Sequence, residues 1–165
     1  MWESAYWVRT LKSDCRVLIL GSLPGAMSLA QQQYYGNPRN QFWAILGNLL
    51  EADLTSLTYQ DRLSAIAARG IGLWDCIGSA QRRGSLDSAI RHAEANPLAA
   101  LAERLPDLRA VAFNGGASAR LGLPQLADFP HIASFALPST SPAHTLPLSA
   151  KIAAWRVLLP WLGGG

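Results

Sequence analysis

Four polar segments, each directly after an apolar run, hold most of the side chains that could do chemistry. They are GSLPG at 21–25, DCIGSAQRRGS at 75–85, NGGAS at 114–118 and PSTSPAH at 138–144. Their amide side chains can donate and accept hydrogen bonds, which matches the N–H and C=O edge of a deaminated base. Their hydroxyl and guanidinium groups suit contacts with phosphate. These residue types make a nucleic acid one candidate ligand.

A fifth segment, QQQYYGNPRNQFW at 31–43, adds amide and aromatic side chains. Tyr35 is one of two adjacent tyrosines before a Gly-Asn-Pro turn, where a ring needs something to pack or stack on. Asn40 stands where a helix over Gln41–Leu50 is expected to begin. It is therefore either the N-cap of that helix or an amide available for chemistry.

Two of the apolar runs end in a polar residue with two interpretations. Asn114 either satisfies its own loop or reads the edge of a base. Asp75 either caps a helix or pairs with an arginine, or it accepts a hydrogen bond from a base N–H. Ser22 and Leu23 lie in the glycine turn after the first run, where glycines allow a tight turn and a close approach to a ligand.

Arginine and serine residues gather in QRRGSLDSAIRH at 81–92. Ser85 is the predicted N-cap of a helix, with Arg82, Arg83 and Arg91 around it. A helix N-terminus flanked by guanidinium groups binds phosphate well. A solvated loop is the alternative on composition alone.

The segment PSTSPAH contributes Ser139, Ser141, Ala143 and His144. Rigid Ser-Pro turns with free N–H groups suit phosphate contacts. A Ser-His-Asp triad of Ser141, His144 and Asp75 fails on pattern, because the chain has no GxSxG elbow. The three histidines also lack the spacing of metal ligands, so no metal site is predicted.

The composition is that of a globular protein. The chain has 165 residues, 50% of them hydrophobic and 15% charged, and a net charge of +3. We predict one domain over residues 1–165. No membrane span is predicted, because no apolar run approaches the ~20 residues that a span requires. The cytoplasm is predicted because the first residues hold Glu3 and lack the apolar region of a signal peptide. Cys15 and Cys76 lie far apart in apolar segments and are expected to be free buried thiols. The small positive charge is compatible with a polyanionic partner.

Short apolar runs alternate with helical patterns along the chain. The predicted strands are Val17–Ser22, Ile71–Cys76, Ala110–Asn114 and Ile132–Leu137. Besides Gln41–Leu50, the predicted helices are Tyr59–Arg69 after Thr58, Pro97–Leu105 with Asn96 as N-cap, and Leu148–Leu159. This order predicts an α/β fold with a parallel sheet covered on both faces. Ligands bind outside the carboxyl ends of such strands, so the polar segments should converge on one cleft.

Five motifs in this order resemble the uracil-DNA glycosylase superfamily, and more narrowly its hypoxanthine-DNA glycosylase branch, called family 6. The motifs are GSLPG, YYGNPRNQFW, GLWD with RRGSLDSAI, FNGG and STSPAH. The resemblance implies a three-layer α-β-α fold with a four-stranded parallel sheet. It also implies a monofunctional glycosylase that works as a monomer on damaged DNA, without a metal or organic cofactor. Such an enzyme everts a damaged nucleotide and hydrolyses its N-glycosidic bond.

The residues at the motif positions imply individual roles. Leu23 stands where most of the superfamily has a water-activating Asp or Asn, so that task passes to Asn40. Tyr35 is expected to stack on the everted purine. Ser139 replaces the usual His or Asn of the last motif, and Ala143 replaces a residue that is often large and wedges into the base stack.

The remaining implied roles concern the base. Asn114 is expected to bond the base edge, with Asp75 as a helper. Two alternatives stay open. The substrate could be uracil or several deaminated bases including xanthine, or the chain could be a nucleic-acid-binding module without catalysis.

Overall fold

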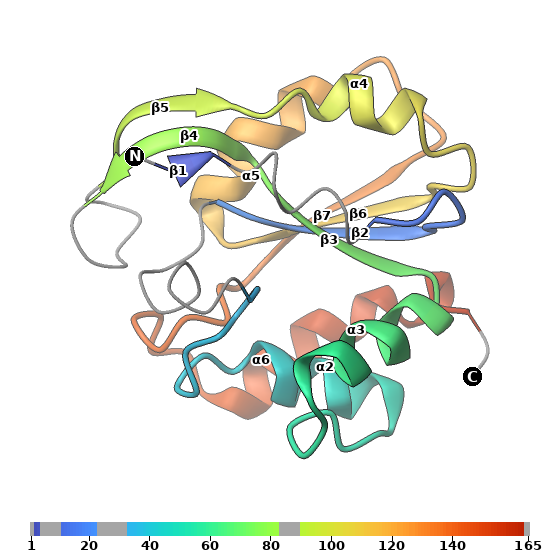
Figure 1. Cartoon of the computed structure of the whole chain (residues 1–165), viewed down its shortest axis with the longest axis vertical. Helices are drawn as coiled ribbons and strands as arrows, with labels where there is room; N and C mark the ends of the chain where they lie inside the picture. Colours follow the sequence, from blue (N-terminus) through green and yellow to red (C-terminus); the bar gives the residue numbers. More distant parts are fainter. Residues whose placement is uncertain (1, 4–10, 23–32, 83–89, 164–165) are drawn as a thin grey trace.

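A four-stranded parallel sheet lies at the centre of the computed structural model (Figure 1). Its order is β3 (Ile71–Asp75), β2 (Val17–Gly21), β6 (Ala110–Asn114) and β7 (Ala133–Leu137). The structure describes residues 2–3, 11–22, 33–82 and 90–163, with the backbone alone at 2–3, 77–82 and 90–95. All three pairings are parallel, so the four strands end at the same edge of the sheet, as predicted.

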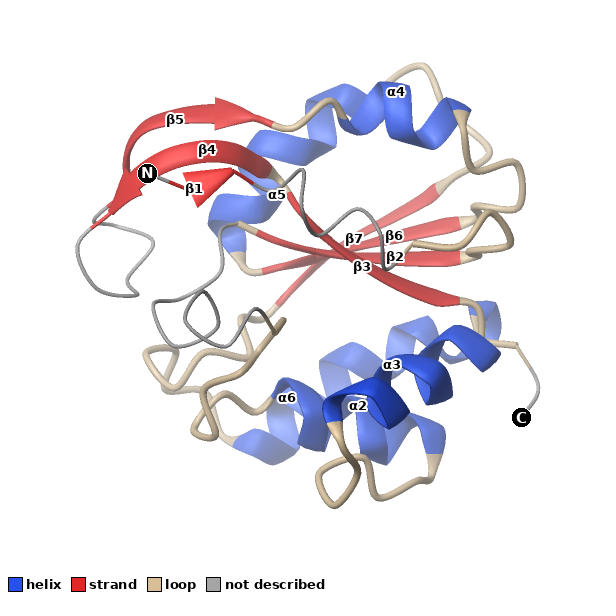
Figure 2. Cartoon of the chain, in the orientation of Figure 1, coloured by secondary structure: helices blue, strands red, loops and turns tan. Residues whose placement is uncertain are grey.

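Alternate residues of the central strands enter two separate cores. In β2, Val17 and Ile19 belong to one hydrophobic cluster, while Leu18 and Leu20 belong to the other, and all four are fully buried. A strand that is buried on both sides reads as a continuous apolar run, which is why the sequence reveals it. Helices cover both faces (Figure 2), so the predicted three-layer α/β class is confirmed.

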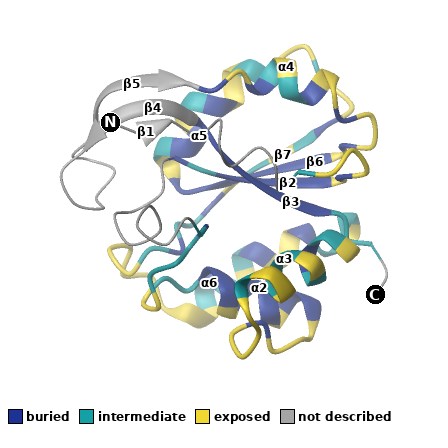
Figure 3. Cartoon of the chain, viewed as in Figure 1, coloured by how far each residue is buried: buried dark blue, intermediate teal, exposed yellow. Residues whose placement is uncertain are grey.

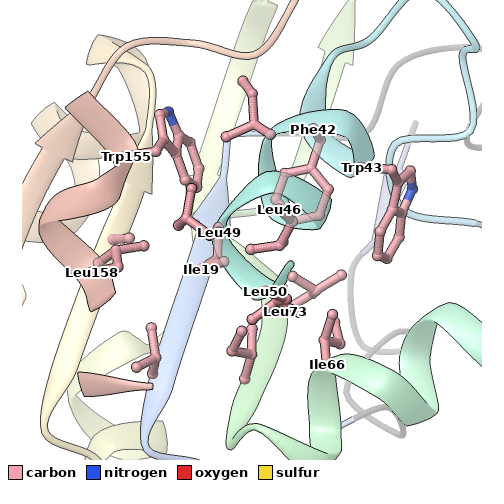
Figure 4. Packing of buried hydrophobic residues seen from close by; sticks show 14 of the residues in the cluster. Ile19, Phe42, Trp43, Leu46, Leu49, Leu50, Ile66, Leu73, Trp155 and Leu158 are labelled. Atoms are coloured by element: carbon pink, nitrogen blue, oxygen red, sulfur yellow. The ribbon is translucent and has the colours of Figure 1, made fainter. Parts of the chain in front are cut away.

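The first face is covered by α2 (Phe42–Leu50), α3 (Tyr59–Ala68) and α6 (Leu148–Trp155), and α6 continues into the 3-10 helix η4 (Arg156–Trp161). Figure 4 shows the aromatic side chains of α2 and α6 against the aliphatic side chains of β2 and β3. The ring centroids of Phe42 and Trp155 lie 6.1 Å apart, edge to face. As predicted, the side chain of Thr58 caps α3 by accepting from the Asp61 N–H.

The second face is covered by α4 (Leu98–Glu103), α5 (Gly116–Gly122) and the 3-10 helix η3 (Leu123–Leu126). At its last residue α5 approaches the sheet so closely that a Cβ on Gly122 would overlap the ring of Phe113. Gly115, between β6 and α5, has a φ of +96°, a conformation that favours glycine. This turn connects the end of β6 to the start of α5.

A second, antiparallel sheet of β1 (Trp2–Glu3), β4 (Ile77–Arg82) and β5 (Ile90–Ala95) corrects one prediction. Residues 90–95 form a strand instead of part of a helix starting at Ser85. Ser85 itself and Arg83 lie outside the described residues. Figure 1 shows β4 leaving the end of β3, so that this sheet stands at the carboxyl edge of the central sheet.

Three other expectations need correction. The N-cap position of α4 is Pro97 and not Asn96, and no side-chain cap bond is made there. The Asn96 side-chain amide donates to the Asp75 carbonyl at 2.7 Å, and Gln125 Oε1 accepts from the Leu98 N–H. β7 is an edge strand with Ser134 and Ala136 exposed, so it is not buried throughout. The last predicted helix changes to 3-10 geometry after Trp155.

Figure 3 shows burial concentrated in the central sheet and on the inner sides of the helices. No helix in the described ranges is long and apolar enough to cross a membrane.

Candidate active site

The carboxyl edge of the central sheet brings the predicted polar segments together. Asp75 and Asn114 are the last residues of β3 and β6, and Ser22 follows β2 directly. All three are at least nine-tenths buried. The loop 138–147 follows β7 and lies beside the segment 33–41 (Figure 1). Leu23 falls outside the described residues, and of Arg82 only the backbone, at the end of β4, is described.

The side chain of Asn40 makes hydrogen bonds both to the start of α2 and to the loop that follows β7. Its Oδ1 accepts a hydrogen bond from the Phe42 N–H at 3.0 Å, which satisfies one of the orphan donors at the start of α2. The same oxygen accepts from the Thr140 hydroxyl at 2.7 Å. The N-cap position of α2 is Gln41, which makes no side-chain cap bond, so Asn40 bonds the start of the helix from one residue before the cap. This bond does not exclude chemistry: within the described residues Asn40 Nδ2 makes no hydrogen bond, and the side chain is only partly buried.

Asn114 is tied to Thr140 at both ends of its amide. Its Nδ2 donates to Thr140 Oγ1 at 3.0 Å, and its Oδ1 accepts from the Thr140 N–H at 2.9 Å. Asn114 is 7% exposed and Thr140 is fully buried. Asn114 thus makes hydrogen bonds to a neighbouring loop, which is one of the two interpretations of this residue. One hydrogen on its Nδ2 remains for a ligand.

Thr140 is the residue that sequence reasoning missed. It connects Asn40 with Asn114, and its carbonyl also accepts from the Gln41 N–H at 3.0 Å. Its position between Ser139 and Ser141 in STSPAH gave no signal of its own, because both of its side-chain partners are distant in the sequence.

The loop 138–144 corrects the expectation of free N–H groups for phosphate. Ser139 Oγ accepts from the Ser141 N–H at 3.1 Å, and Ser141 Oγ accepts from the Ala143 N–H at 3.2 Å. The His144 N–H donates to the Ser141 carbonyl at 3.1 Å. These three backbone donors are used inside the loop, so the serine hydroxyl hydrogens and the exposed His144 side chain are the groups left for a ligand.

A buried lysine supports the same loop from α6. Lys151 is 1% exposed, and its Nζ donates to Gln41 Oε1 at 2.9 Å and to the Ser141 carbonyl at 3.2 Å. No carboxylate pairs with it among the described residues, and burial lowers the pKa of its ammonium group. Trp155 adds a second support, donating from Nε1 to the Pro138 carbonyl at 2.9 Å.

Tyr35 lies at the carboxyl edge of the sheet, with its hydroxyl close to Gly21. Its ring stacks on Phe42 with centroids 3.8 Å apart and an interplanar angle of 14°. Its backbone has a φ of +55°, which is uncommon for a non-glycine residue and often found at functional sites. Because Tyr35 is only partly buried, it can stack on a planar ligand while Phe42 keeps the ring in place.

Asp75, the last residue of β3, is 2% exposed. Burial raises the pKa of Tyr34, and the nearby charge of Asp75 raises it further. A Cβ on Gly21 would lie 3.4 Å from the Tyr35 hydroxyl and 3.5 Å from Asp75 Oδ1. The Asp75 carboxylate and the Tyr35 hydroxyl therefore both lie close to Gly21, the last residue of β2.

Known proteins match this chain in sequence and structure. The sequence profile of the uracil DNA glycosylase superfamily matches residues 8–162. Proteins called hypoxanthine DNA glycosylase from Methanosarcina barkeri and Methanosarcina acetivorans are 43% and 42% identical over 105 residues. The matched region covers 64% of this chain and 66% of each relative, slightly less than two thirds of the relative's length.

A solution NMR structure from Methanosarcina acetivorans, described as a candidate uracil DNA glycosylase, superimposes with a TM-score of 0.81. It is 35% identical, and the superposition covers 91% of this chain and 92% of that one. The resemblance carried by the five motifs is therefore confirmed: the chain belongs to the uracil DNA glycosylase superfamily.

Proposed function

We propose that this protein is a monofunctional DNA glycosylase that hydrolyses the N-glycosidic bond of a deaminated base, with hypoxanthine as the preferred base. The names of the two relatives that are 42–43% identical support this choice of base. The proposal includes action as a monomer, in the cytoplasm, on damaged DNA and without a metal or organic cofactor.

One observation carries the proposal. Asn40 and Asn114, from segments far apart in the chain, are joined through Thr140 at the edge where a parallel sheet binds its ligands. A partly buried ring, Tyr35, lies at the same edge. Amides next to an aromatic platform provide what an everted base needs, namely stacking and hydrogen bonds to its edge.

In the proposed reaction the C1′–N bond breaks and water supplies the oxygen of a new C1′–O bond. Asn40 Oδ1 already accepts two hydrogen bonds, so Nδ2 is the group that holds the water. An amide does not take up a proton at neutral pH. Asn40 therefore positions the water, and the proton that the water loses goes to the departing base.

The other residues act on the base and the backbone of the DNA. Tyr35 stacks on the base, and Asn114 donates its remaining hydrogen to the base edge, where negative charge develops as the bond breaks. Ser22, Leu23 and Asp75 belong to the base-binding set. The phosphate contacts come from the residues Arg82, Arg83, Ser85, Ser139, Ser141 and His144, while Ala143 faces the gap left by the base without the bulk of a wedge.

The test is cleavage of duplexes that carry one deoxyinosine, deoxyuridine or deoxyxanthosine, followed by alkali to break the abasic strand. We expect deoxyinosine to be processed fastest and an undamaged duplex not at all. A higher rate on deoxyuridine than on deoxyinosine would mean that uracil is the preferred base. If the protein binds DNA but forms no alkali-labile product on any lesion, it is a nucleic-acid-binding module without catalysis.

A further inference from the structure

Thr140 is fully buried, and each of its polar groups makes a hydrogen bond. Its N–H and Oγ1 contact the two ends of the Asn114 amide, and its hydroxyl hydrogen goes to Asn40. Its carbonyl accepts from Gln41, the residue next to Asn40. No other side chain in the described ranges bonds both asparagines.

The direction of each bond follows from backbone donors that cannot be reversed. The Phe42 N–H must meet an acceptor, so the Asn40 atom facing it is Oδ1. The Thr140 N–H likewise identifies Asn114 Oδ1, which leaves Asn114 Nδ2 to donate to Thr140 Oγ1. Since a hydroxyl has one hydrogen, Thr140 Oγ1 gives it to Asn40.

We infer that Thr140 is a positioning residue: its hydroxyl holds the Asn40 amide in the orientation that presents Nδ2 to the reacting water. This inference rests on the proposed glycosylase function. The Phe42 N–H alone fixes Oδ1 at one point and leaves the amide able to rotate about that bond. The second donor, from a buried threonine that is itself held by Asn114, removes this freedom.

Removing the hydroxyl should therefore affect the reaction more than DNA binding. Thr140→Val keeps the shape of the side chain but leaves Asn40 Oδ1 with one donor and Asn114 Nδ2 without its acceptor. A small misplacement of a positioning group can lower a rate by as much as about 100-fold. Thr140→Ser keeps the hydroxyl and should restore the rate.

The experiment measures three quantities for each variant: the single-turnover rate on a deoxyinosine duplex, the dissociation constant for that duplex, and the thermal midpoint. We expect Thr140→Val to lower the rate by about 10- to 100-fold, with the dissociation constant within about threefold of the wild type. Thr140→Ser should stay within about threefold of the wild type in both quantities, because the donor is kept.

Ser118→Ala is the matched control, because Ser118 is also fully buried and donates to the Leu20 carbonyl at 2.7 Å, on the second face of the sheet. It should lower the thermal midpoint and leave the single-turnover rate unchanged. A rate loss in Thr140→Val that Ser118→Ala reproduces at equal loss of stability would overturn the positioning role.

Two further outcomes are decisive. A wild-type rate in folded Thr140→Val overturns the inference, whereas an inactive wild type on every lesion overturns the proposed function instead. If the valine variant does not fold, Thr140→Cys replaces it, because a thiol is a much weaker donor than the serine hydroxyl in a side chain of the same shape. Equal rates for the serine and cysteine variants would then contradict the inference.

Discussion

The two faces of the central sheet differ in what they contribute to the carboxyl edge. On the first face, side chains of the helices reach the site itself: Phe42 lies under Tyr35, Lys151 bonds the Ser141 carbonyl and Trp155 bonds the Pro138 carbonyl. On the second face, Ser118 donates to a strand carbonyl instead. The first face shapes the site, and the second face mainly stabilises the sheet on which the site is built.

The comparison predicts that the largest effect on catalysis comes from Asn40 at the start of α2. Asn40→Ala should reduce cleavage of a deoxyinosine duplex by about 10²–10³-fold or more, since it removes a donor aimed at the reacting atoms. DNA binding should stay within several-fold. Single-turnover kinetics and fluorescence anisotropy measure the two quantities.

Asn48→Ala is the control for that variant, because Asn48 is an exposed asparagine on the same helix. It should behave as the wild type in both assays. Undiminished turnover by Asn40→Ala would refute the role assigned to Asn40.

The largest effect on stability is expected on the second face, at Gly122. In Gly122→Ala the new methyl group meets the Phe113 ring and lies 3.1 Å from Cys76 Sγ. Overpacking of this kind lowers the free energy of unfolding by about 1–3 kcal/mol. The rate of cleavage below the melting temperature should not change, because this helix end does not touch the site.

Gly116→Ala, on the same helix, is the matched control for overpacking. A Cβ there meets nothing within 4 Å, so the variant should be neutral or stabilised by up to about 1 kcal/mol. Urea unfolding compares the two alanines, and equal stabilities would argue against the tight helix–sheet contact.

A smaller effect is expected at Lys151 on the first face. Lys151→Met should slow cleavage by about tenfold or less, because the loop 138–144 loses one anchor but keeps Thr140 in place. Stability at neutral pH should not fall, since an unpaired buried cation opposes folding and an apolar chain of similar length does not. A large loss of stability in the methionine variant would contradict this account of the ammonium group.

The pH dependence of stability should have opposite signs for Lys151 and for the two buried thiols. Burial lowers the Lys151 pKa from 10.5, so between the lowered pKa and 10.5 the unfolded state binds more protons and stability rises with pH. Burial raises the pKa of Cys15 and Cys76, both in the core of the second face, from 9.0 to about 12. The folded state then holds protons that the unfolded state loses, so this stability is lost as pH rises above 9.0.

Urea unfolding of wild type and Cys76→Ala at pH 8 and pH 10 measures the contribution of one thiol. The wild type should lose about 1.4 kcal/mol more than the alanine variant between the two conditions. If the difference in the free energy of unfolding between wild type and Cys76→Ala is the same at pH 8 and pH 10, the thiol is accessible to water in the folded protein.

Sequence reasoning succeeded where a residue's task is local. The strands β2, β3 and β6 were predicted to within one residue because burial on both faces leaves a continuous apolar run. The cap at Thr58 was predicted, and the start of α2 was predicted to within one residue, because a cap acts within three residues of itself.

The same reasoning failed where partners are distant in the sequence. Thr140 bonds Asn40 and Asn114, which are 100 and 26 residues away, and no local pattern marks such a link. Lys151 is missed for the same reason, since its partner Gln41 is 110 residues away. The sequence around Ser85 predicts a helix, whereas residues 90–95 pair with β4 as the strand β5.

The most direct measurement of the central claim is NMR of the side-chain amides during titration with a duplex that contains 2′-fluoro-deoxyinosine, which resists cleavage. The account predicts that the Nδ2 signals of Asn40 and Asn114 shift together on binding, and that an undamaged duplex leaves both in place. Shifts confined to other parts of the protein, with both amide signals unmoved, would contradict a base-binding site at this edge of the sheet.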